Sequence, residues 1–139
     1  MKVLSKGYGN DYWKNTPYKD VETRRHEDGP NPVSFALPNG SGRPALLAAL
    51  ERGVGAILAF GRPDLVLYQA GADPYKEDPY SPLDLDLDDL KERDRLVFEW
   101  ACRESLPLAW VLAGGYTPDV SKVVAVHLGT FDAANAAYC

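Results

Sequence analysis

Two side chains, Asp73 and Tyr116, are the residues of this sequence best placed to do chemistry. Each follows an apolar run and a glycine-bearing turn, in residues 63–74 (PDLVLYQAGADP) and 106–119 (LPLAWVLAGGYTPD). A carboxylate can bind a metal ion, and a phenol can donate a hydrogen bond to negative charge that develops during a reaction. Each also has a structural interpretation, because aspartate before proline is a common turn residue and tyrosine after two glycines is often a lid on the core.

The elements that must position these residues are two buried strands. The runs at residues 65–68 and 108–112 do not alternate polar with apolar side chains, which is typical of strands covered by helices on both faces. Such strands form parallel sheets, and ligands bind just beyond the carboxyl ends of these strands. We therefore expect Asp73 and Tyr116 to open toward one common edge of a sheet.

Apolar residues at helical spacing predict three helices around these strands. The first extends from Pro44 to Gly61 with Ser41 as a possible cap, and the second runs to about Ser105. Four aspartates crowd the start of the second helix, where carboxylates stabilise the positive end of the helix dipole. The third helix begins at Thr117, whose hydroxyl is a candidate cap.

The resulting order of helix, strand, helix, strand and helix predicts a three-layer α/β/α sandwich with a mainly parallel sheet. One or two further strands are expected from the first forty residues, where residues 2–5 and 33–37 favour strands. We interpret residues 1–139 as a single domain in which residues 1–32 are largely an irregular loop.

Composition narrows the classes of function. The 139 residues are 45% hydrophobic and carry a formal charge of −5, with no cluster of basic residues, so nucleic acid is not an expected partner. Cys102 and Cys139 form no disulfide or zinc-ribbon pattern, which fits a reducing compartment. With no signal-peptide core and no membrane-length apolar run, we expect a cytoplasmic protein that does not bind membranes.

Five motifs in consistent order resemble the C-terminal half of the zinc-dependent deacetylases. The motifs are PDLVLYQAGADP, EDPYSPLDL, LKERDRLVFEWA, LPLAWVLAGGYTPDV and HLGT, and the resemblance spans roughly residues 33–131. This family comprises histone deacetylases, acetoin-utilisation proteins and acetylpolyamine amidohydrolases, which share an arginase-like fold. The resemblance therefore implies a truncated arginase/deacetylase fold and hydrolysis of acetyl-lysine or acetylpolyamines.

The same resemblance implies roles for individual residues. In the family the aspartate of the AGAD turn is a zinc ligand, and the tyrosine of the GGY turn stabilises the oxyanion formed when metal-bound water attacks the amide. Those roles fall on Asp73 and Tyr116. Gly71, Gly114 and Gly115, which have no side chains, would leave room for a substrate channel beside the backbone. Tyr80 stands where the family has a leucine in its DPLGG loop, and it would contact substrate.

Several family residues have no counterpart in this sequence. The Asp-x-His motif that supplies the other zinc ligands is absent, as are the vicinal histidines that act as base and acid. The histidines present are His26 and His127, and neither has an aspartate two residues before it. One carboxylate does not hold zinc tightly, so the zinc that the family resemblance implies need not be bound here. We expect the isolated chain to have weak catalytic activity or none.

Three expectations about partners follow. The strand at residues 108–112 would present a bare edge, which predicts a homo-oligomer that covers it. Alternatively, the chain is one part of a split deacetylase, and a complementing chain supplies Asp-x-His. A further alternative is a non-catalytic module that binds a small ligand or a protein, with Tyr75, Tyr80 and Tyr116 forming an aromatic rim.

Overall fold

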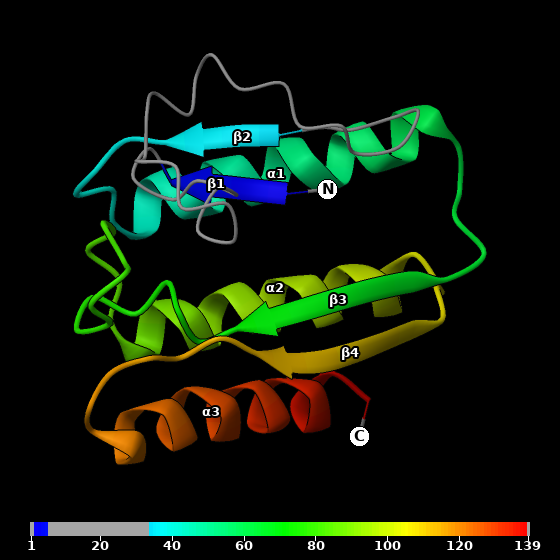
Figure 1. The fold of residues 1–139 in the computed structure, drawn as a ribbon. Coiled ribbons are helices and arrows are strands. Elements are labelled where there is room, and N and C mark those ends of the chain that lie inside the picture. Colours follow the sequence, from blue (N-terminus) through cyan, green and yellow to red (C-terminus); the bar gives the residue numbers. More distant parts are fainter. Residues whose placement is uncertain (1, 6–33, 139) are drawn as a thin grey trace, which may run out of the picture.

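The structure of the chain is a computed structural model that describes residues 2–5 and 34–138. Three helices and four strands occur along these residues (Figure 1). In chain order they are β1 (Lys2–Ser5), β2 (Ser34–Leu37), α1 (Arg43–Phe60), β3 (Val66–Gly71), α2 (Leu87–Arg103), β4 (Leu108–Ala113) and α3 (Val120–Tyr138). The irregular loop predicted over residues 1–32 lies outside the described residues, apart from β1.

The strands form two parallel pairs. β1 pairs with β2, and β3 pairs with β4 in a register that runs from Val66 opposite Leu108 to Gly71 opposite Ala113. The unbroken apolar runs predict this parallel pairing. Because parallel strands end at the same edge, the turns that follow β3 and β4 lie together.

One face of the β3–β4 pair is packed against α2 and α3. The ring of Phe98 in α2 meets the ring of Tyr68 edge-to-face at a centroid distance of 5.9 Å, and the ring of Trp110 at 5.2 Å. Leu67 and Val111 are exposed by 78% and 62%. Since side chains alternate along a strand, they belong to the opposite face, which the three described helices leave uncovered.

Helix α1 lies on the same face of the β3–β4 pair as α2 and α3. Val54 and Ile57 of α1 pack, together with Val66 of β3, against a buried cluster formed by Trp100, Ala101 and Leu106. The chain is thus an α/β protein with parallel strands, as predicted, while the second helical layer of the sandwich has no counterpart among residues 2–5 and 34–138. Within those residues, no helix is both long and apolar enough to cross a membrane.

The start of α2 is determined by its acidic residues. The Asp86 carboxylate accepts the N–H of Asp89 at 3.0 Å, and the Asp89 carboxylate accepts the N–H of Asp86 at 3.1 Å. This reciprocal capping box satisfies two backbone donors that the helix leaves free, and the hydrogen bond from the Asp89 backbone lowers the pKa of Asp86. The predicted capping role of the aspartate cluster is confirmed.

The other two predicted caps are wrong. Ser41 does not cap α1, because the N-cap is Gly42 and no side-chain capping bond is present there. Thr117 does not cap α3, because the Asp119 carboxylate accepts the N–H of Ser121 at 3.0 Å instead. Aspartate is at least as good an N-cap as threonine, so a helix that starts after Asp119 rather than after Thr117 loses little stability.

A buried ionic network joins β3, α2 and α3. The Asp94 carboxylate accepts hydrogen bonds from the Tyr68 hydroxyl and from Arg93 Nε, the latter at 2.8 Å. It also accepts one from Thr130 Oγ1 at 2.6 Å. Arg93 Nη1 donates to the Gly71 carbonyl at 2.8 Å. Burial raises the pKa of Tyr68, so its hydroxyl remains a donor.

Replacing Asp94 should expose how much the fold depends on this network. Asp94→Ala leaves the buried Arg93 guanidinium without its counter-ion, and we expect the free energy of unfolding in urea to fall by about 3–5 kcal/mol. Thr130→Val keeps the side-chain shape and removes one hydrogen bond, so it should cost about 1 kcal/mol. Equal losses for the two variants would contradict a charge-based role for Asp94.

Candidate functional site

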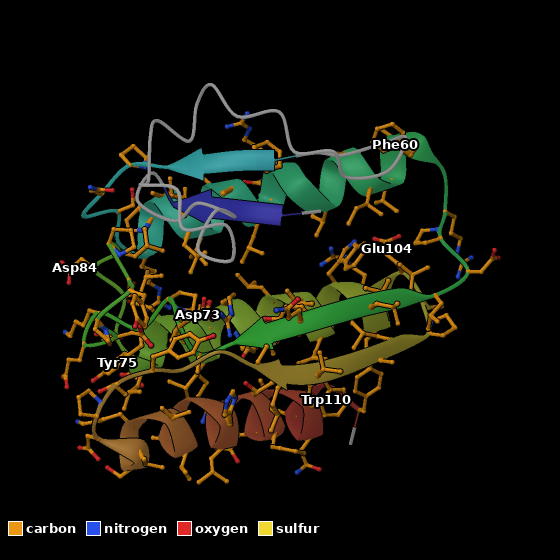
Figure 2. All side chains as sticks on the ribbon, in the orientation of Figure 1. Phe60, Asp73, Tyr75, Asp84, Glu104 and Trp110 are labelled. Carbon is orange, nitrogen blue, oxygen red and sulfur yellow. The ribbon has the colours of Figure 1, made fainter. Side chains whose placement is uncertain are left out.

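The carboxyl ends of β3 and β4 form the candidate site. The N–H of Ala72 donates to the Ala113 carbonyl at 2.8 Å, which extends the ladder one step past Gly71. Asp73 and Gly114 are the next residues of the two turns. Figure 2 shows Asp73 at this end of the molecule, away from Phe60 at the end of α1.

The Asp73 carboxylate rests against glycine backbone from both turns. A methyl group placed on Gly114 would lie 2.2 Å from Asp73 Oδ1, and one placed on Gly71 would lie 2.6 Å from the same atom. Gly114 also has a φ of +61°, a conformation that glycine adopts without steric penalty. These two glycines therefore make the space that the carboxylate occupies.

Gly115 has a different packing partner. Its φ is +96°, and a methyl group there would lie 2.7 Å from Val123 Cγ1 and 3.1 Å from Ala72 Cβ. Gly115 thus lets the β4 turn approach the first turn of α3 closely. The channel role that the family resemblance implies for Gly71, Gly114 and Gly115 stays a prediction.

Asp78 joins the loop after β3 to the turn after β4. Its side chain is 3% exposed, and its Oδ2 accepts the N–H of Tyr116 at 2.6 Å. Its Oδ1 accepts the N–H of Tyr80 at 2.9 Å. The bond to Tyr80 is a local turn contact of a kind that Asp-Pro sequences favour. The hydrogen bond to Tyr116 joins residues 38 positions apart in the chain. The sequence analysis did not predict it, because no pattern of neighbouring residues indicates such a contact.

Two of the three tyrosines predicted to form an aromatic rim do so. The rings of Tyr80 and Tyr116 meet edge-to-face, with centroids 5.3 Å apart and planes at 81°, and they are 45% and 54% exposed. Tyr75 is not part of this rim, because it is 4% exposed in the core and donates to Glu77 Oε1 at 2.8 Å. Burial and this bond raise the pKa of Tyr75 to about 12.

The arginine of the buried network supports the end of β3. Arg93 Nη1 binds the carbonyl of Gly71, two residues before Asp73. His127 of α3 has a pKa lowered first by burial and then by the positive charge of Arg93, and its buried Nδ1 has no hydrogen-bond partner. Arg93 therefore places a fixed positive charge on the helical side of the sheet, and this charge acts on both the end of β3 and the imidazole of His127.

The described residues do not form a complete metal centre. Within residues 2–5 and 34–138, no group of three or more histidine, cysteine, aspartate or glutamate side chains is placed to hold a metal ion. A zinc site needs about three protein ligands, whereas the candidate site offers the Asp73 carboxylate. His26 lies outside the described residues.

Comparison with known proteins identifies the family. The histone deacetylase domain family matches residues 13–131. Histone deacetylase 2 of Arabidopsis thaliana is 36% identical over 64 residues, covering 46% of this chain and 16% of that protein. Acetylpolyamine amidohydrolase 1 of Pseudomonas aeruginosa is 32% identical over 96 residues, covering 68% of this chain and 26% of that protein. The chain therefore belongs to the histone deacetylase family.

A solved structure of a deacetylase-family protein has a similar fold. The acetylpolyamine aminohydrolase of Burkholderia pseudomallei superimposes with a TM-score of 0.65 at 24% identity, over 76% of this chain and 29% of that one. The predicted truncated arginase/deacetylase fold is thus confirmed. The chain spans less than a third of the length of each of these three proteins.

Gly114→Ala should displace Asp73. The new methyl group combines the left-handed backbone penalty of about 1 kcal/mol with overlap of the carboxylate, so we expect a loss of stability and a changed Asp73 resonance in NMR spectra. Gly40→Ala is the matched control, because Gly40 has a φ of +76° and no atom within 4 Å of an added methyl group. If both variants lose the same free energy in urea, Asp73 does not rest on Gly114.

Proposed function

We propose that this chain contributes one carboxylate and one phenol to an amide-hydrolysing centre of the zinc-dependent deacetylase type. Asp73 acts as one zinc ligand, and Tyr116 donates a hydrogen bond to the carbonyl oxygen of an acetylated amine as negative charge gathers there. The observation that carries the proposal is the contact of the Asp73 carboxylate with glycine backbone at both strand ends. One of these glycines, Gly114, stands two residues before Tyr116 in the turn after β4. Membership of the family supports it.

Tyr116 is suited to this role by its backbone as well as by its phenol. Asp78 holds the Tyr116 N–H from within the core, and the Tyr80 ring packs edge-on against the Tyr116 ring. A donor that is fixed before the reaction stabilises charge without a cost of reorganisation. The exposed pair of Tyr80 and Tyr116 also supports a second candidate function, in which the chain binds a small ligand or a protein without catalysis.

The 139 residues are catalytically silent by themselves under this proposal. Amide hydrolysis of this type requires a general base and further metal ligands. Asp73 supplies a single ligand, and His127 lies on α3, on the helical side of the sheet, with its Nδ1 buried. The remaining groups have to come from a segment outside these residues, either in the same polypeptide or in a complementing chain.

Activity and metal content test these roles together. The purified chain should retain no zinc and should hydrolyse neither an acetyl-lysine peptide nor acetylputrescine. A fusion of this chain to the unmatched portion of the Pseudomonas aeruginosa amidohydrolase should bind zinc, and Asp73→Ala should remove that zinc while Asp64→Ala should not. In the same fusion, Tyr116→Phe should keep the zinc and slow hydrolysis by about 10²–10³-fold.

Two results would contradict the proposal. Hydrolysis by the 139-residue chain alone that disappears in Asp73→Ala would show that the isolated chain is an active enzyme. Equal zinc content in the Asp73→Ala and Asp64→Ala fusions would remove Asp73 from the metal site.

The edge of β4 supports a proposal about assembly. In the described residues β4 pairs with β3 on one side, and Val111 and Leu112 are exposed. We infer that two copies cover this edge by pairing their β4 strands antiparallel around a two-fold axis.

Sedimentation should accordingly detect a dimer of the 139-residue chain. Val111→Lys, which places a charge beside the β4 edge, should yield a monomer at the same concentration. Val124→Lys on the exposed side of α3 is the control and should leave the dimer intact. A monomer at high concentration for the unmodified chain would rule this assembly out.

A further inference from the structure

The turn after β4 has little conformational restraint of its own. Gly114 and Gly115 precede Tyr116, and their φ angles are +61° and +96°. Glycine has no Cβ and adopts both signs of φ readily, so two consecutive glycines leave the residue that follows them weakly placed. Packing restricts one of them, since a methyl group on Gly115 would lie 2.7 Å from Val123 Cγ1. The position of Tyr116 therefore depends on contacts with residues outside the turn.

The carboxylate of Asp78, in the loop after β3, supplies such a contact and uses both of its oxygens. Oδ2 accepts the N–H of Tyr116 at 2.6 Å, and Oδ1 accepts the N–H of Tyr80 at 2.9 Å. The rings of these two tyrosines meet edge-to-face with their centroids 5.3 Å apart. One side chain thus binds the backbone of both members of the exposed aromatic pair.

The loop that carries Asp78 is itself held by a series of turns. The N–H of Asp78 donates to the Tyr75 carbonyl at 2.9 Å, and the N–H of Tyr75 donates to the Ala72 carbonyl at 3.1 Å. Ser81 Oγ donates to the Pro74 carbonyl at 3.0 Å. Because Tyr75 lies in the core with 4% of its surface exposed, these turns connect Asp78 to the packed part of the chain.

The chemistry of Asp78 matches the task of holding two backbone donors. The residue is 3% exposed and takes part in no ion pair among the described residues. Moving an unpaired carboxylate out of water costs free energy, which two charge-assisted hydrogen bonds offset in part. A carboxylate offers two acceptor oxygens and no donor. Asp78 can therefore bind two N–H groups at once, which the amide of asparagine cannot do.

We propose that Asp78 is a positioning residue for the Tyr116 phenol. It binds the backbone of Tyr116, and it fixes Tyr80, whose ring packs against the ring of Tyr116. This inference rests on the proposed function, in which the phenol donates to the carbonyl oxygen of the substrate, and Asp78 itself touches neither substrate nor metal. A donor placed before the reaction stabilises developing charge best. Loss of Asp78 should therefore slow the chemical step and leave substrate binding unchanged.

Asp78→Asn tests the proposal in the fusion of this chain to the unmatched portion of the Pseudomonas aeruginosa amidohydrolase. Asparagine has almost the same shape but one acceptor oxygen, so one of the two N–H groups would face an NH₂ group. We expect kcat for acetylputrescine to fall about 10–100-fold, with KM and zinc content unchanged. Asp84→Asn is the matched control, because it makes the same chemical change at an exposed position of the same loop (Figure 2), and it should leave kcat unchanged.

A double variant separates positioning of the phenol from a general structural role. If Asp78 acts through the Tyr116 phenol, Asp78→Asn should slow the fusion further by less than about twofold once Tyr116→Phe has removed that phenol. Equal slowing by Asp78→Asn with and without Tyr116→Phe would show a structural role and overturn the proposal. An unchanged kcat in Asp78→Asn, with hydrolysis slowed in Tyr116→Phe, would overturn it as well. If Tyr116→Phe itself leaves kcat unchanged, the proposed function is wrong and this inference falls with it.

Amide hydrogen exchange of the unmodified 139-residue chain gives a second measurement that needs neither a variant nor zinc. The amides of Tyr80 and Tyr116 should both exchange at least about tenfold more slowly than in an unstructured peptide, because the same buried carboxylate holds them. Asp78→Asn should speed the exchange of at least one of these amides, and Asp84→Asn should change neither. Unprotected exchange of the Tyr116 amide in the unmodified chain would show that Asp78 does not hold the turn, and would overturn the proposal.

Discussion

The register of β3 against β4 is the constraint on which the candidate site depends. Gly71 lies opposite Ala113, and one further hydrogen bond carries the ladder to Ala72 before both chains turn. This alignment places the Asp73 carboxylate against Gly114. A slip of one residue would reverse the facing of every side chain in the strand, and the carboxylate and the glycine would no longer meet.

The buried ionic network makes that register difficult to change. Asp94 is bound by donors from β3, from its own helix and from α3, and Arg93 returns from α2 to the carbonyl of Gly71. Loss of one partner from such a buried charged group is strongly destabilising. The network therefore links the position of the turn after β3 to the packing of α2 and α3. It lies on the face of the sheet opposite the exposed Leu67.

The uncovered face and edges of the sheet reflect the share of the family fold that this chain represents. The family members reported above are at least three times longer than the matched part of this chain. Parallel sheets are stable when both faces and most edges are covered, and here the described helices cover one face. Asp73 and Tyr116 thus follow the carboxyl ends of two parallel strands that the described helices cover on one face.

The sequence by itself determined the features that arise from neighbouring residues. The apolar runs predicted β3 and β4 and their parallel pairing, the aspartate cluster predicted the capping of α2, and linked motifs identified the family, because each signal lies within a short stretch of chain. Only the tertiary structure decided that Tyr75 is buried, that Asp78 binds the backbone of Tyr116, and that the strands form two separate pairs. These outcomes depend on contacts between residues far apart in the chain, which local patterns of polarity and turn chemistry do not encode.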